Sequence, residues 1–290
     1  MEKLRFTVAI STYNVERYVK RAVKSVLNQT FKNYELLVID DCSTDSTMKI
    51  IKELNRQEIK VLTTNKNSGT AAATRNIAIN NAKGEYLVFL DGDDELFSKD
   101  TLKEIDEHIK ENTYDIIYFG YESVENEDRY YRISNKDNST REARLICDES
   151  FSVSSKVWNV KFLRDNNVKF IEGVYYEDEL FSIKTNILSK KTTYGEIPIF
   201  KYYRNNEGSV MTKPTIKKCS DWYRMLAEVT DLYEITPEED KKYLLSFLKN
   251  ENDSIPLRIK NVISALREKR KTKVLPKRKY KFIDIFEDME

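Results

Sequence analysis

The stretch Tyr86-Leu87-Val88-Phe89-Leu90-Asp91-Gly92-Asp93-Asp94 decides the fold of this chain. Its apolar run is typical of a strand that is buried on both faces of a parallel sheet. The run stops at three carboxylates grouped around one glycine. The loop beyond the carboxyl end of such a strand is where open α/β sheets bind their ligands.

Three carboxylates this close together repel one another unless a positive charge lies among them. A divalent cation that carries a diphosphate would supply that charge. The competing interpretation is structural, because Asp-Gly is a common turn signal and acidic residues are frequent in solvated loops. The rest of the chain decides between the two interpretations.

Strands and helices alternate over the first 120 or so residues. Apolar runs predict strands at 6–10, 36–39, 59–63, 87–90 and 116–119. Apolar residues at helical spacing predict helices near 18–27, 48–54, 71–82 and 102–109. This order implies an α/β fold in which helices flank a mostly parallel sheet.

Three of the predicted strands end in polar sequence. The ends are Ser11-Thr12-Tyr13-Asn14, Asp40-Asp41 and the acidic loop 91–94. Because the carboxyl ends of parallel strands meet at one edge of a sheet, these side chains are expected to converge on a single ligand crevice.

Composition limits the classes of function. The 290 residues carry a formal net charge of +1, which gives no indication of a nucleic-acid partner. The single histidine, His108, disfavours histidine-based catalysis, so carboxylates are expected to do any acid–base chemistry. The cysteines, Cys42, Cys147 and Cys219, are few and scattered, which favours free thiols in a reducing cytoplasm. No signal-peptide pattern and no bilayer-spanning apolar run is present, and a cytoplasmic location is expected.

The remaining chain divides into a polar stretch, an apolar return and a helical end. Residues 122–144 are polar and predict a surface excursion, whereas 158–204 is expected to form a second half of the same domain. We therefore predict a catalytic domain at 1–212, with halves at 1–121 and 145–212, and a helical C-terminal extension at 213–290.

A basic block occupies the end of the extension, between Arg267 and Lys279. The simplest interpretation is a solvated helix followed by a loose tail. An alternative is peripheral docking on an anionic membrane surface. Nucleic-acid binding is a weaker third interpretation, because aromatic residues are not interleaved with the basic ones.

An ordered set of motifs resembles family 2 glycosyltransferases with the GT-A fold. The set covers roughly the first 210 residues, and its order is more specific than any one piece. Its members are Val8-Ala9-Ile10-Ser11-Thr12-Tyr13-Asn14, Asp40-Asp41-Cys42-Ser43-Thr44-Asp45, Asn67-Ser68-Gly69 with Thr74-Arg75-Asn76, the acidic loop 91–94, Trp158-Asn159, Phe170-Ile171-Glu172-Gly173, Tyr176-Glu177-Asp178-Glu179 and Tyr202-Tyr203-Arg204 with Ser209. Two positions depart from the family pattern: Ser11 replaces a usual proline, and Cys42 replaces a common glycine, so that turn must tolerate a Cβ atom.

The resemblance implies transfer of a sugar from a UDP-sugar, with inversion, to a hydroxyl of a glycan, a lipid-linked glycan or a protein. It implies a role in bacterial surface polysaccharide synthesis and a Mn²⁺ or Mg²⁺ cofactor, which an all-oxygen site suits. By the same resemblance Asp93 binds the metal. The nucleotide-binding residues would be Thr12, Tyr13, Asn14, Asp41, Arg75 and Asp91.

Asp178 is the candidate general base, with Glu177 as its rival, because inversion needs one carboxylate beside the acceptor hydroxyl. The structural alternative is that the two acids only open a helix, where the positive end of the dipole favours them. The residues expected to contact the acceptor or the diphosphate are Asp94, Trp158, Glu177 and Arg204. Core packing is the alternative for Trp158, and a surface helix position is the alternative for Arg75.

Other functions stay open at this point. A nucleotidyltransferase that makes nucleotide-sugars would share the sheet and the metal, but it needs a glycine-rich phosphate loop, and 11–18 contain no glycine. A retaining transferase of similar fold is a second possibility. A non-catalytic scaffold or binding module that uses the basic tail is a third.

Overall fold

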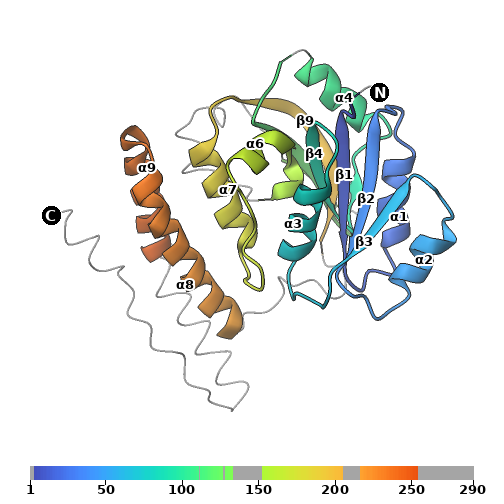
Figure 1. Cartoon of the computed structure of the whole chain (residues 1–290), viewed down its shortest axis with the longest axis horizontal. Helices are drawn as coiled ribbons and strands as arrows, with labels where there is room; N and C mark the ends of the chain where they lie inside the picture. The colour runs from blue at the N-terminus through green and yellow to red at the C-terminus, as the bar shows by residue number, and fades with distance from the viewer. Residues whose placement is uncertain (1–2, 111, 127, 133–151, 205–215, 254–290) are drawn as a thin grey trace.

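The computed structural model describes residues 3–110, 112–126, 128–132, 152–204 and 216–253. Within these residues nine strands form one sheet, in the order β3-β2-β1-β4-β8-β6-β9-β5, with β7 paired to β6 (Figure 1). The strands are β1 Phe6–Thr12, β2 Tyr34–Asp40, β3 Ile59–Thr63, β4 Tyr86–Asp91, β5 Glu95–Leu96, β6 Ile116–Glu125, β7 Asp128–Arg132, β8 Lys156–Asn159 and β9 Thr192–Tyr203.

The α-helices are α1 Val19–Leu27, α2 Thr47–Glu53, α3 Ala72–Asn81, α4 Thr101–Ile109, α6 Val160–Asp165, α7 Glu177–Leu188, α8 Ile216–Asp231 and α9 Glu238–Asp253. Short 3₁₀ turns lie at Val153–Ser155 and Leu232–Ile235. The predicted strands and helices of the first 120 residues are all present, and the α/β class is confirmed.

The parallel part of the sheet is β3-β2-β1-β4. Its register pairs Thr12 of β1 with Asp40 of β2, and Ser11 of β1 with Asp91 of β4. The polar ends of three strands therefore lie side by side at one edge, as the sequence predicts. The strands alternate between two cores: Val8 and Ile10 pack with α1 and α4, whereas Ala9 packs with α3 and α6.

The second half of the sheet departs from the predicted surface excursion. β6 continues to Glu125 and pairs antiparallel with β7, so residues 122–125 are strand residues. Glu122 and Ser123 are buried there, and Arg129 on β7 forms an ion pair with the Glu122 carboxylate at 3.2 Å. Polar composition hid this strand, because the charge of Glu122 is compensated by a partner across the ladder rather than by water.

Trp158 is a core residue, and its predicted contact with the acceptor is wrong. Its side chain is fully buried on β8, edge-on to Phe181 at 5.1 Å between ring centroids. The indole Nε1 donates a hydrogen bond to the Val153 carbonyl at 3.1 Å. The ring belongs to the buried cluster that also contains Phe162, Phe170 and Phe181.

The C-terminal helices pack on α7, away from α1 and α2 (Figure 1). Leu180 and Ile183 of α7 contact a cluster formed by residues of α8 and α9, which include Trp222, Met225, Leu226, Val229 and Leu244. In the described part of the chain no helix is long and apolar enough to cross a membrane. The basic block of residues 267–279 lies outside the described residues, so its predicted membrane contact stays a prediction.

Gly84 gives a test of the close contact between the start of β4 and the start of β1. A Cβ atom at this position would lie 2.4 Å from the backbone of Phe6 and Thr7, so the two segments would have to separate. We expect Gly84→Ala to lower the free energy of unfolding by about 1–3 kcal/mol, measured by urea denaturation. Lys83→Ala, at the exposed neighbouring position, is the control and should change it little. Equal stability of the two variants would contradict this packing.

Candidate active site

The acidic loop is held at the end of β4 by a glycine. A Cβ atom on Gly92 would lie 2.9 Å from the Ser11 carbonyl oxygen and 3.0 Å from side chains of Thr12 and Val15, so only glycine fits without a shift. The Gly92 amide donates to that same carbonyl at 2.9 Å. The loop carrying Asp91 and Asp93 is thereby fixed against the end of β1.

Arg75 on α3 joins two carboxylates from different elements. Its Nη2 atom lies 3.0 Å from Asp91 Oδ1, and its Nη1 atom lies 3.2 Å from Glu177 Oε1. Only 8% of the Arg75 side chain is exposed, so the surface interpretation of this residue is wrong. The guanidinium also lies 5.6 Å from the centroid of the Phe170 ring. The loop after β4 and the start of α7 are thus tied through one cation.

Glu177 and Asp178 open α7, and Glu179 completes an acidic first turn. This position is favourable for anions because the helix dipole is positive there. Burial, with the neighbouring Asp178 charge as a smaller cause, raises the pKa of Glu177 to about 7 against the opposing effect of Arg75. Burial also raises the pKa of Asp178, and the charges of Arg75 and Lys156 oppose this rise. The two adjacent acids titrate as a pair.

One cavity of about 490 Å³ brings the acidic loop and the start of α7 together. Asp91 and Asp94 lie in its wall, and so do Arg75, Glu177 and Asp178. Tyr175, Tyr176 and Tyr202 add aromatic surface. Carboxylates from the edge of the sheet and from the start of a helix thus face one space.

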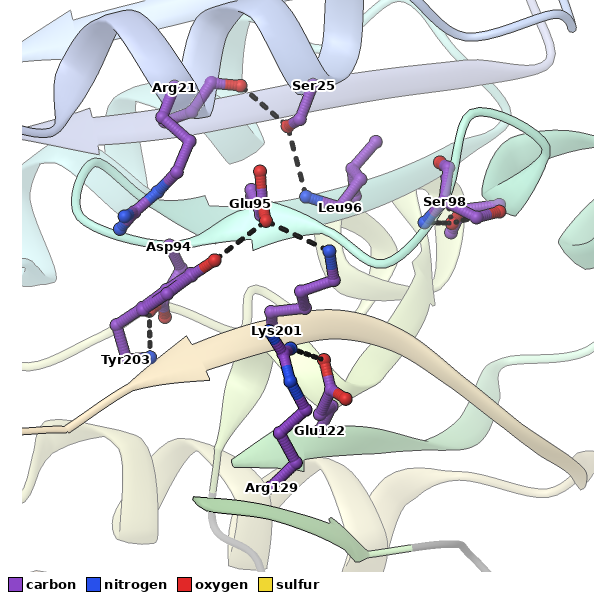
Figure 2. A network of polar contacts seen from close by, with 12 residues as sticks. Arg21, Ser25, Asp94, Glu95, Leu96, Ser98, Glu122, Arg129, Lys201 and Tyr203 are labelled. Atoms are coloured by element: carbon purple, nitrogen blue, oxygen red, sulfur yellow. Dashed lines mark hydrogen bonds and ion pairs between the residues drawn. The ribbon is translucent and has the colours of Figure 1, made fainter. Parts of the chain in front are cut away.

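Asp94 is bound to the end of β9 rather than open to solvent (Figure 2). Its Oδ1 atom accepts a hydrogen bond from the Tyr203 amide at 2.9 Å. Burial, followed by the charges of Asp93 and Asp91, raises the pKa of Asp94 well above its ordinary value. Arg21 of α1 lies 3.6 Å from the centroid of the Tyr203 ring and donates to the Asp93 carbonyl. Nothing in the sequence pattern marks Arg21, because it occupies a helix position between apolar neighbours.

Glu95 extends the network that fixes this loop (Figure 2). Its Oε1 atom accepts from the Tyr203 hydroxyl at 2.8 Å and forms an ion pair with Lys201 at 3.1 Å. Arg204, the next residue along, is exposed and its amide donates to the Val124 carbonyl. The structure leaves its predicted diphosphate contact untested, and Ser209 lies outside the described residues.

Asp40 and Asp41 hold the turn after β2. Asp40 accepts hydrogen bonds from the Thr12 hydroxyl at 3.0 Å and from the Ser43 amide at 2.8 Å. Cys42 has a φ of 62°, so the turn does adopt the left-handed conformation for which glycine is usual. The Asp41 carboxylate accepts from the Thr64 hydroxyl at 2.8 Å and from the Ser68 amide at 2.9 Å.

The other predicted nucleotide residues lie at the same edge of the sheet. Tyr13 exposes 47% of its surface, which leaves an aromatic face accessible. Asn14, next in the chain, accepts a hydrogen bond from the Thr44 amide at 2.8 Å. Ser11, which replaces the usual proline, accepts a hydrogen bond from the Thr74 hydroxyl at 2.8 Å and links β1 to α3. The structure thus brings all three strand ends together, with Arg75 and α7 facing them.

The acidic loop offers oxygen ligands that suit a hard divalent cation. Among the described residues no three acidic, cysteine or histidine side chains are arranged to hold a metal ion by themselves. Asp91, Asp93 and Asp94 bring negative charge together in this loop, and the charges of Asp93 and Asp91 add to the burial that raises the pKa of Asp94. The residues fit a cation that completes its ligand shell with oxygens from a bound diphosphate.

Known proteins with similar sequences are glycosyltransferases. A model described as "Glycosyl transferase family 2" matches residues 7–187. The poly(ribitol-phosphate) beta-N-acetylglucosaminyltransferase TarS of Staphylococcus aureus is 28% identical over 230 residues, which are 77% of this chain and 39% of TarS. TarP of the same species, named for the same activity, is 33% identical over 208 residues, covering 69% of this chain and 62% of TarP. The chain therefore spans about two fifths of the length of TarS.

Solved structures agree. Residues 1–349 of S. aureus TarS in complex with UDP-GlcNAc superpose with a TM-score of 0.71 at 26% identity, over 84% of this chain and 71% of that one. A mannosyltransferase from Pyrobaculum calidifontis, at 15% identity and a TM-score of 0.63, covers all of this chain and 80% of its own, and shows likeness of fold alone. The GT-A fold predicted from the sequence is confirmed. The chain belongs to glycosyl transferase family 2.

Proposed function

We propose that this chain transfers a sugar, with inversion, from a UDP-sugar to a hydroxyl group of a glycan or glycolipid acceptor, with the help of a divalent metal ion. One observation carries the proposal: Asp91 of the acidic loop and the Glu177–Asp178 pair face one cavity and share the cation Arg75. A donor held at the sheet edge and an acceptor beside α7 would meet in that cavity.

The donor class is supported by the strand ends and by the relatives. TarS, at 26% identity, has been solved with UDP and with UDP-GlcNAc. In this chain the exposed ring of Tyr13 is suited to stack on the base, with Thr12 and Asn14 shaping the turn beside it. Asp41 Oδ1 accepts one bond from Thr64 and retains a lone pair for uracil N3–H. N-acetylglucosamine and glucose are the proposed sugars, since relatives are named for both.

Asp93 is the proposed protein ligand of Mn²⁺ or Mg²⁺, and Asp91 would approach the ribose or a metal-bound water. The bound cation would neutralise charge on the departing diphosphate. Gly92 keeps the loop against Ser11 and thus holds both aspartates at the sheet edge. Arg204, which directly follows β9, remains the proposed second contact to the diphosphate.

Asp178 is the proposed general base. It would accept the proton of the acceptor hydroxyl while that oxygen attacks the anomeric carbon on the face opposite the leaving phosphate, which inverts the configuration. Glu177 is the weaker candidate because its Oε1 atom is held by Arg75 at 3.2 Å. A carboxylate oxygen that is engaged by a buried guanidinium is less available to an acceptor hydroxyl.

The proposed acceptor is a bacterial surface polymer that bears hydroxyl groups, such as a polyol-phosphate chain. TarS and TarP are named for poly(ribitol-phosphate), and the minor teichoic acid biosynthesis protein GgaB of Bacillus subtilis is 29% identical over 269 residues, which are 87% of this chain and 27% of GgaB. Lys218 of α8 lies in the cavity wall together with Tyr175 and is suited to an anionic acceptor. We propose synthesis on the cytoplasmic side of the membrane.

Asp178→Asn tests the base. Removal of a general base costs about 10²–10⁴ in rate, so we expect kcat for transfer from UDP-GlcNAc to a polyol-phosphate or glycan acceptor to fall by that factor. UDP affinity, measured by calorimetry, should stay within about threefold because the change lies across the cavity from the nucleotide. Asp165→Asn, at an exposed position of α6, is the matched control. Full turnover by Asp178→Asn would move the base elsewhere.

Asp93→Asn tests the metal. The wild-type chain should bind UDP more tightly with Mn²⁺ than with EDTA, because the cation bridges the loop and the diphosphate. Loss of the ligand should weaken the Mn²⁺-dependent binding about tenfold or more, while binding in EDTA stays unchanged. Asp165→Asn should keep the metal effect. Equal UDP affinity in Mn²⁺ and EDTA for the wild type would exclude the metal, and no UDP binding at all would favour the scaffold alternative.

A further inference from the structure

The side chain of Arg75 is almost completely enclosed by protein groups, with 8% of it exposed. Its two Nη atoms are used by Asp91 and Glu177, and its buried Nε atom has no hydrogen-bond partner. The next residue, Asn76, pins the chain that leads into α7, since it donates to the Phe170 carbonyl at 2.9 Å and accepts from the Phe170 amide at 2.8 Å. One turn of α3 therefore positions both the guanidinium and the approach to the proposed base.

Asp178 is surrounded by charges from several elements. Arg75 of α3 and Lys156 of β8 are the cations that act on it. The other titratable groups that share its helix turn or the cavity wall are Glu177 and Glu179 of α7, Asp91 and Asp94 of the acidic loop, Tyr121 of β6, Tyr175 and Tyr176 before α7, Tyr202 of β9 and Lys218 of α8. Acids outnumber cations in this set, so the ionised form of Asp178 depends on the few positive charges and on backbone hydrogen bonds, such as the one that the Glu179 amide donates to its Oδ1 atom at 3.0 Å.

Arg75 is the cation with the largest effect on both acids of the pair. It is the first charge that opposes burial at Glu177 and also at Asp178, and Lys156 has a smaller effect on Asp178. Loss of the guanidinium would leave two adjacent carboxyl groups in a shielded site without the cation that opposes their protonation, and both would bind a proton more tightly. A protonated Asp178 cannot accept the acceptor proton.

We propose that Arg75 is a positioning residue that keeps Asp178 ionised, by neutralising Glu177 beside it and fixing the start of α7 to the acidic loop. This inference rests on the proposed function for its catalytic meaning, although the ionisation itself can be measured without turnover. It differs from the predicted nucleotide contact, because the partners that the structure shows for the two Nη atoms are protein carboxylates. A purely structural clamp would stabilise the fold without changing the protonation of Asp178.

The experiment compares Arg75→Gln with Arg5→Gln. Arg5 also forms ion pairs with two carboxylates, Glu85 at 2.9 Å and Asp106 at 2.7 Å. It directly precedes β1, however, and so lies at the opposite end of this strand from the acidic loop. The carboxyl carbons of Glu177 and Asp178 are titrated by ¹³C NMR in the full chain, with Glu177→Gln and Asp178→Asn for assignment. The pH profile of kcat is measured in parallel. Arg75→Lys, which keeps the charge but not the two-nitrogen fork, provides a second variant should Arg75→Gln fold poorly.

In Arg75→Gln the protonation midpoint of Glu177, which loses its arginine partner, should rise by about one to three pH units, and the midpoint of Asp178 should rise in the same direction. The acid limb of kcat should move upward with it, since the base works only when ionised, and the rate should recover at high pH. Arg75→Lys should give a smaller rise in the same direction. Glu177→Gln should move the Asp178 midpoint downward, and Arg5→Gln should leave it in place.

An Asp178 midpoint that stays unchanged in both Arg75 variants would overturn the inference, even if Asp178→Asn shows that transfer depends on this residue. Conversely, a midpoint that rises in a chain without transfer would support control of Asp178 by Arg75 while the proposed function fails. A midpoint that moves equally in Arg5→Gln would also overturn the inference, because the effect would then follow from loss of stability.

Discussion

Several carboxylates lie at the edge of the sheet where the parallel strands end. The site depends on the positive charges and hydrogen-bond donors that compensate each of these carboxylates. Arg75 pairs with Asp91 and Glu177, so a single buried guanidinium offsets charge from the acidic loop and from α7. Asp41 is compensated by hydroxyl and amide donors of the next loop, and Asp94 by the Tyr203 amide. Because unpaired buried charges are costly, these partners fix the loops in one arrangement.

Aromatic side chains pack α7 against the second half of the sheet. The Phe170 ring stacks on Phe181 of α7 with centroids 3.8 Å apart, and Trp158 closes the cluster edge-on to Phe181. The guanidinium of Arg75 lies 5.6 Å from the centroid of the Phe170 ring in the same cluster. The start of α7 is therefore held by an ion pair on one side and by a core on the other, which would hold the proposed base at a defined distance from a bound substrate.

The features predicted correctly from the sequence are those that depend on residues close together along the chain. Buried strands appear as apolar runs, and the polar ends that follow them located the crevice, because parallel strands share an edge. Arg75, Trp158 and Glu122 were misjudged or left open for one reason: each has its environment set by residues outside its own helix or strand, which local periodicity cannot report. A polar residue among the alanines of α3 looks exposed until the carboxylates that enclose it are known.

A crystal structure of this chain with UDP and Mn²⁺ tests the central claim most directly. The account predicts the diphosphate at the carboxyl ends of β1 and β4, the metal bound to Asp93, and the Asp178 carboxylate across the cavity with its path to the bound donor open. UDP bound elsewhere, with Asp91 and Asp93 in bulk solvent and far from any phosphate, would contradict it.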